Sequence, residues 1–81
     1  MGKLSQAPDL FDKAINIFLS IASVWTRTKA PLVWATTLAN LGAALKEKGD
    51  AQGSRAILSK AADAFRQAGE VFTELNMERY V

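Results

Sequence analysis

The stretch Pro31–Leu45, PLVWATTLANLGAAL, decides the fold of this chain. Pro31 suits the first turn of a helix, because its fixed φ angle is helical and its missing N–H has no helical partner there in any case. The Leu41–Gly42 pair marks a place where a neighbouring helix must come close. The large apolar side chains recur at steps of four, three and four residues, which places them on one helical face: Trp34, Leu38, Leu41 and Leu45. This stretch therefore predicts the first helix of a helical repeat.

Length and composition indicate one small domain. We expect residues 1–81 to form a single helical domain, in which residues 1–8 are flexible and residues 79–81 fray. A domain this short buries only about 60% of its unfolded surface, which leaves it marginally stable. Apolar residues nevertheless make up 49% of the chain. We therefore expect some apolar surface to be covered by another copy or another protein.

Missing residue types and balanced charge exclude several classes of site. The chain contains no Cys and no His, which removes disulfide bonds and the usual zinc ligands. Ten basic and eight acidic residues give a net charge of +2, and the basic residues gather only near one predicted turn, at Lys46, Lys48 and Arg55. Nucleic-acid binding needs several cations on one face, so we expect no nucleic-acid partner.

A further helix is predicted before this stretch, from Pro8 to Trp25. It carries two adjacent apolar stripes at steps of four and three residues: Leu10, Ala14, Ile17, Ile21 and Val24, and beside them Phe11, Ile15, Phe18, Ala22 and Trp25. Two adjacent stripes make a wide apolar face. We therefore expect this helix to be covered from more than one side, and the chain to leave it between Thr26 and Ala30.

The central helix and a third helix are expected to meet at a glycine-containing turn. Lysines in a last turn followed by glycine predict that the central helix ends near Lys48, with Gly49 after it. Asp50 is expected to cap the third helix, which begins at Ala51 or after Gly53. Its inner face is predicted to consist of small and apolar residues: Ile57, Ala61, Ala64, Ala68, Val71 and Leu75.

The first and third helices resemble each other at an offset of 47 residues. Both apolar stripes superimpose at this offset, and five positions are identical: Lys13, Ala14, Phe18, Val24 and Thr26 correspond to Lys60, Ala61, Phe65, Val71 and Thr73. This internal repeat predicts an all-α fold of three antiparallel helices, or about one and a half helical hairpins.

These residues resemble the tetratricopeptide repeat family. Its pattern has Leu-Gly in the first helix of a repeat and Ala-x3-Phe-x2-Ala in the second, as Leu41–Gly42 and Ala61–Ala68 have here. The closer likeness is to a long-repeat bacterial variant, whose first helix reads Pro-Leu-x-Trp-Ala and then Asn-Leu-Gly-x-Ala-Leu. Pro31–Ala35 and Asn40–Leu45 match that pattern, and the resemblance covers residues 10–75.

The resemblance implies a scaffold that binds another protein or a peptide segment. Such a scaffold receives a helix or an extended segment in an apolar groove, and the groove residues expected here are Trp34, Leu38, Asn40, Leu41, Phe65 and Phe72. Asn40 is polar among apolar neighbours, and it either hydrogen-bonds a ligand backbone or satisfies the end of a neighbouring helix. The chain holds only one and a half repeats, and several positions are apolar where the long-repeat variant has polar residues: Val33, Leu38 and Ala39. We therefore expect a homodimer or a higher homo-oligomer.

No constellation of side chains predicts catalysis. Glu70 and Glu74 lie one turn apart on a helix surface, where carboxylates normally face solvent. The segment Gly49–Ser54 lacks the lysine of a phosphate-binding loop and follows a helix rather than a strand. The apolar run Ala14–Trp25 is too short to span a bilayer. We therefore expect a cytoplasmic protein that is not an enzyme, with no cofactor, no metal and no membrane partner.

A purely structural role is the alternative: a self-assembling helical module with no separate ligand. The segment Glu78–Val81 has no proline at the position equivalent to Pro31, so we expect the repeat to stop there. A helix lying on a membrane surface over Leu10–Arg27 is disfavoured, because its apolar face is too wide and its flanks are poor in cations.

Overall fold

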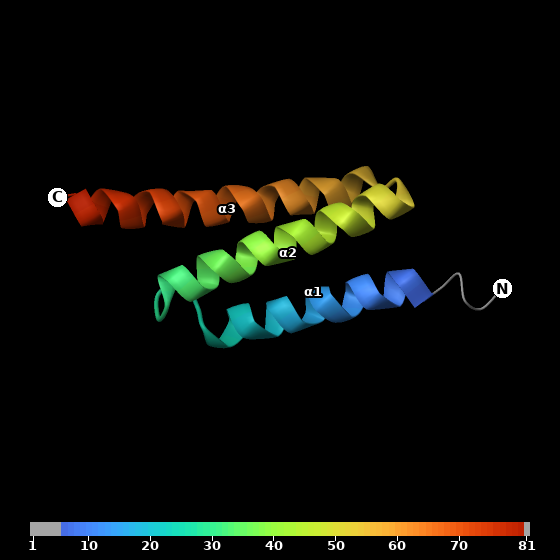
Figure 1. Cartoon of the computed structure of the whole chain (residues 1–81), viewed down its shortest axis with the longest axis horizontal. Coiled ribbons are helices and arrows are strands. Elements are labelled where there is room, and N and C mark those ends of the chain that lie inside the picture. The colour runs from blue at the N-terminus through green and yellow to red at the C-terminus, as the bar shows by residue number, and fades with distance from the viewer. Residues whose placement is uncertain (1–5, 81) are drawn as a thin grey trace.

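Residues 6–80 fold into three α-helices that run antiparallel, one after another (Figure 1). The computed structural model describes residues 6–80, with side chains over residues 10–77. Its helices are α1 (Gln6–Val24), α2 (Pro31–Gln52) and α3 (Arg55–Tyr80), and no strand occurs among the described residues. The predicted all-α class with three antiparallel helices is confirmed. The sequence predicted that residues 1–8 are flexible and that residues 79–81 fray. Of these, residues 1–5 and Val81 lie outside the described part of the chain.

Pro31 begins α2, as its position in the sequence predicted. It occupies the first turn, and Ala30 before it has φ −148° and ψ 75°, outside the helical region. A residue before proline is disfavoured in the helical region, so α1 and α2 do not merge into one helix. The connection from Trp25 to Ala30 is itself folded, since the backbone N–H of Ala30 donates to the Thr26 carbonyl and that of Lys29 donates to the Thr26 hydroxyl.

The turn between α2 and α3 lies later than predicted. α2 continues past Gly49 to Gln52. The residue that follows the helix, Gly53, has a left-handed conformation with φ +63°. The N–H of Ser54 donates to the Gly49 carbonyl and that of Gly53 to the Asp50 carbonyl, the two bonds of a Schellman motif. The Ser54 hydroxyl accepts the N–H of Ile57 and thereby caps α3. The predictions that Gly49 ends α2 and that Asp50 caps α3 were therefore wrong.

Gly49 serves close packing instead of a turn. A Cβ atom at Gly49 would lie 2.8 Å from the Leu58 side chain, and one at Gly42 would lie 3.0 Å from the Phe65 ring. Both glycines are buried, and Ala35, also buried, continues the row at the same seven-residue spacing. This row of small residues lets the axes of α2 and α3 approach each other. The predicted role of Gly42 at a contact between helices is confirmed.

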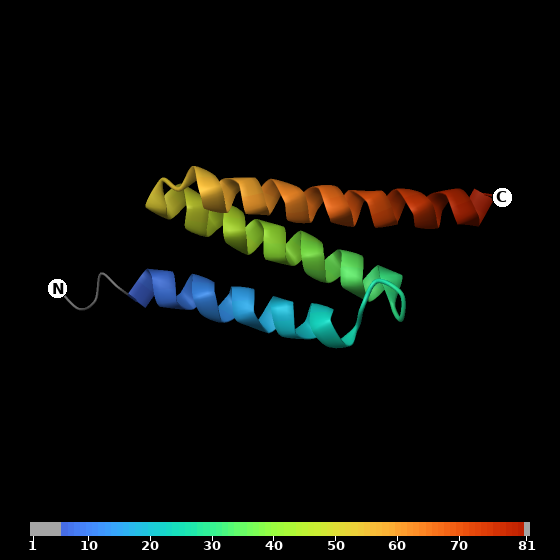
Figure 2. The same cartoon turned by 180° about the vertical axis from the view of Figure 1, so that it is seen from behind.

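The helices form one flat layer with α2 in the middle. Both α1 and α3 pack against α2, and the views from the two sides show α2 between them (Figure 1, Figure 2). The molecule extends 57 × 24 × 14 Å, so the layer is about one helix thick. Its buried apolar cluster comes from α2 and α3: Ala35, Leu38, Leu41, Ala68 and Val71.

α1 packs one of its two apolar stripes against this core and leaves most of the other exposed to solvent. On the exposed stripe, Leu10 is 66% exposed and both Ile17 and Val24 are 58% exposed. The half-buried stripe contributes three side chains to the packing: Ile15, Phe18 and Ala22. Within a single chain this helix is covered from one side only, because the end helix of a layer has one neighbour, so the expectation of cover from more than one side stays a prediction about association.

Candidate partner-binding groove

A groove lies on one face of the layer, with α2 as its floor and α1 and α3 as its walls. Its volume is about 440 Å³, and α2 supplies its four large apolar side chains: Trp34, Leu38, Leu41 and Leu45. Ile15 and Leu19 line it from α1, while α3 contributes Lys60, Asp63, Ala64 and Gln67. The groove therefore has an apolar floor, one apolar wall and one largely polar wall.

The floor of the groove forms because α2 packs against α3 with one side and presents large apolar residues to the groove on the adjacent side. The row of small residues contacts α3, and the row of large residues lies on the neighbouring side of the same helix. Leu38 and Leu41 are buried, whereas Trp34 and Leu45 are half-buried. A ligand would therefore contact Trp34, Leu45 and Leu19 most extensively. Leu38, whose apolar character suggested an oligomer contact, is already covered by its own chain.

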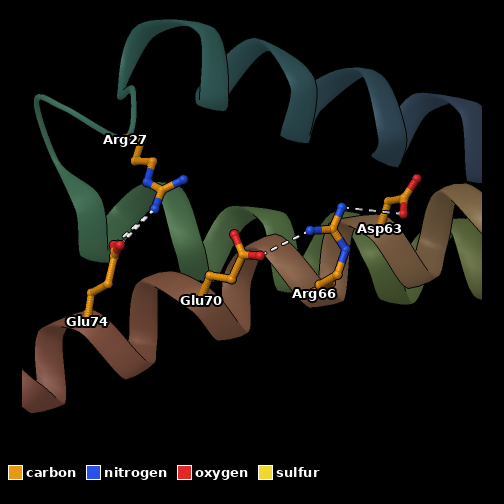
Figure 3. A network of polar contacts seen from close by, with 5 residues as sticks. All are labelled: Arg27, Asp63, Arg66, Glu70 and Glu74. Atoms are coloured by element: carbon orange, nitrogen blue, oxygen red, sulfur yellow. Dashed lines mark hydrogen bonds and ion pairs between the residues drawn. The ribbon is translucent and has the colours of Figure 1, made fainter.

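The polar wall belongs to a line of charged side chains along α3. Arg66 lies 3.6 Å from the Asp63 carboxylate and 3.0 Å from that of Glu70, and Figure 3 shows these residues in succession on one side of α3. All three are exposed, so these pairs contribute little to stability. Of this line, Asp63 reaches the groove, where Lys60 and Gln67 accompany it. The wall thus offers a cation, an anion and an amide to a ligand.

An arginine from the α1–α2 connection lies beside the groove floor. Arg27 Nη2 donates to both carboxylate oxygens of Glu74, at 3.0 and 3.1 Å (Figure 3). Its guanidinium lies 5.7 Å from the centre of the Trp34 ring, within the range of a cation–π interaction. Lys48 of α2 pairs with Asp12 of α1, towards the opposite end of the layer. These two links join α1 and its connection to the helices that form the rest of the groove.

Half of the predicted groove residues line the groove, namely Trp34, Leu38 and Leu41. Asn40 is exposed and lies outside it. Phe65, 41% exposed, covers Gly42 at the contact between α2 and α3. Phe72 is half-buried against the core. The last three residues therefore do not share a site with the first three.

The walls of the groove were missed by the sequence reasoning. Ile15 and Leu19 are one turn apart on α1, and Lys60, Ala64 and Gln67 follow one side of α3. This spacing groups the residues within each helix, but it does not say that α1 and α3 flank the same side of α2. Leu45 carried a usable signal, because it shares the face of Trp34 at steps of four and three residues.

The side chains described over residues 10–77 include no group of three or more placed to bind a metal ion. Within residues 6–80, every helix is too short or too polar to cross a membrane. Compared with known protein families, curated proteins and solved structures, the chain shows no match.

Proposed function

We propose that this chain is a non-catalytic protein–protein interaction module of tetratricopeptide-like type, which also self-associates. Its groove over α2 receives an apolar segment of a partner protein. The observation that supports this most is the row Trp34, Leu38, Leu41 and Leu45 beneath a groove of about 440 Å³. The row extends over about 16 Å of helix, which matches roughly three turns of a partner helix.

The two walls define the chemistry of the partner. The α1 wall is apolar, and its Leu19 is 50% exposed, whereas the α3 wall presents Lys60, Asp63 and Gln67. An amphipathic helix fits this arrangement, with apolar anchors at steps of three and four residues on the floor and the α1 wall. Its polar flank would then face α3. Trp34 is the expected anchoring point, because tryptophan is enriched among the few residues that carry most of the binding energy at such sites, and Leu19 adds apolar contact beside it.

Site-specific photo-cross-linking in the native cells tests this function. A benzoylphenylalanine at position 19 places the reactive group in the groove, and one at position 77 is the matched control, since Met77 is a large apolar residue that is 63% exposed outside the groove. We expect a discrete cross-link from position 19 to a different protein and none from position 77. Equal cross-linking from both positions would contradict a groove-specific partner.

The alternative role is a structural module that assembles only with itself. The exposed stripe of α1 favours it, because Leu10, Ile17 and Val24 are each more than half exposed. Cross-links from position 19 exclusively to further copies of this chain would select this alternative over the proposed function.

A further inference from the structure

A second apolar surface runs along α1, outside the groove. We name it the outer stripe; it consists of five residues at steps of four, three, four and three: Leu10, Ala14, Ile17, Ile21 and Val24. Three of them are more than half exposed, and the other two are half-buried. None lines the groove, so a ligand in the groove would leave the outer stripe in solvent.

The internal repeat identifies the residues of α3 that are equivalent to the outer stripe. At the offset of 47, its five positions correspond to Ile57, Ala61, Ala64, Ala68 and Val71 of α3. In α3 these residues lie at the contact with α2, and the last four are at most 5% exposed. The same pattern therefore forms a helix–helix interface in α3 and stays open in α1. This equivalence indicates that a helix covers the outer stripe.

An exchange of helices between copies does not supply that helix. α2 already packs against both α1 and α3, so a swapped α2 would restore the same contacts and leave the outer stripe open. The stripe is instead complementary to itself. In an antiparallel pair centred on Ile17, Leu10 of one copy meets Val24 of the other, and the small Ala14 meets the large Ile21.

We propose that a second copy of this chain docks on the outer stripe, with its α1 antiparallel to the first and Ile17 at the two-fold axis. This inference rests on the self-association in the proposed function and leaves the groove free. The charges beside the stripe are compatible with this pairing. Among the described side chains, Lys13 is the charged residue directly beside the stripe, and Ser20 lies on the same side of α1, seven residues later. The antiparallel pairing brings Lys13 beside Ser20 of the second copy, about 12 Å along the helix from its Lys13.

The size of the outer stripe sets the expected strength of the dimer. From Leu10 to Val24 the helix rises about 21 Å, with a width of about 10 Å. Such a footprint is well below the roughly 800 Å² that each partner buries in a standard stable interface. We therefore expect a weak, reversible dimer whose fraction depends on concentration.

Single-cysteine variants test the geometry, because the chain has no cysteine of its own. Under mild oxidation, Ile17→Cys should form a disulfide with itself across the axis. Leu10→Cys and Val24→Cys should form a mixed disulfide with each other when combined, and few disulfides when each is alone. Met77→Cys is the exposed control and should stay monomeric. Equal yields from Ile17→Cys and Met77→Cys, or efficient pairing of Leu10→Cys with itself, would overturn the proposed geometry.

Charge at the axis tests the interface itself. Ile17→Glu places two carboxylates opposite each other, so sedimentation equilibrium should show a dissociation constant raised by about 100-fold or more. Circular dichroism should show unchanged helicity, and Met77→Glu should leave the dimer unchanged. The groove variant Leu19→Lys should keep the dimer, and Ile17→Glu with benzoylphenylalanine at position 19 should keep the partner cross-link, which separates this inference from groove binding. Loss of the dimer in Leu19→Lys but not in Ile17→Glu would overturn the assignment to the outer stripe.

Discussion

At the scale of single residues, the small side chains of α2 decide how closely the helices pack. Gly42 and Gly49 lie against Phe65 and Leu58, whereas Gly69 of α3 has open space at the position of a Cβ atom. All three glycines are helical, so alanine has a similar intrinsic advantage of about 1 kcal/mol at each position. Differences among their alanine variants therefore report packing.

We expect Gly49→Ala to lower the free energy of unfolding by about 1 kcal/mol and Gly69→Ala to raise it by about 0.5–1 kcal/mol. At Gly49 the new methyl group would lie 2.8 Å from the Leu58 side chain and 3.1 Å from the Leu58 backbone nitrogen. Overpacking of this kind costs about 1–3 kcal/mol, more than the gain in helix propensity. Urea unfolding followed by circular dichroism measures both variants. Equal stabilisation by the two would contradict the close approach of α2 to α3.

Gly53 presents a different requirement, since its φ of +63° is left-handed and no atom crowds its Cβ position. Gly53→Ala should lower the free energy of unfolding by about 1 kcal/mol, because a Cβ atom strains this conformation. Gly53→Asn is the matched variant and should cost less, since asparagine adopts the left-handed region more readily. The same urea experiment measures both, and an alanine variant as stable as the wild-type protein would argue against the Schellman turn.

At the scale of elements, the helices and their inner faces could be predicted from spacing, but their partners could not. The alanine row of α3 was predicted and is buried, at Ala61, Ala64 and Ala68. Gly49 was misassigned because glycine both ends helices and permits close contact, and only its contact with Leu58 decides between the two. Phe65 was predicted to line the groove, whereas its ring packs against Gly42 at the contact between α2 and α3. The groove walls depend on which helices flank α2, and spacing within one helix carries no information on that.

The link from Arg27 to Glu74 joins the α1–α2 connection to α3, and we expect it to contribute little to stability. Its side chains are 44% and 59% exposed, so solvent screens the pair. Glu74→Gln should lower the free energy of unfolding by less than about 1 kcal/mol, and the loss should shrink in about 1 M salt. Glu70→Gln, whose partner Arg66 lies on the same helix, is the control. A loss above about 2 kcal/mol for Glu74→Gln, unaffected by salt, would contradict a solvent-screened link.

At the scale of the whole molecule, a layer one helix thick cannot cover both sides of its helices. One face holds the groove, and the free side of α1 holds the outer stripe. Apolar residues make up 49% of the chain, yet the buried apolar cluster is small: Ala35, Leu38, Leu41, Ala68 and Val71. We therefore propose that association buries apolar area that folding of one chain leaves exposed, and we expect it to stabilise the fold.

The measurement that tests this most directly is the absolute molar mass in solution, by static light scattering after size exclusion, over about a hundredfold range of concentration. We expect the mass to rise reversibly from near the 8.8 kDa of one chain towards twice that value. The rise should be absent in Ile17→Glu and preserved in Met77→Glu. A wild-type mass of one chain at every concentration would contradict self-association through the surface that folding leaves exposed.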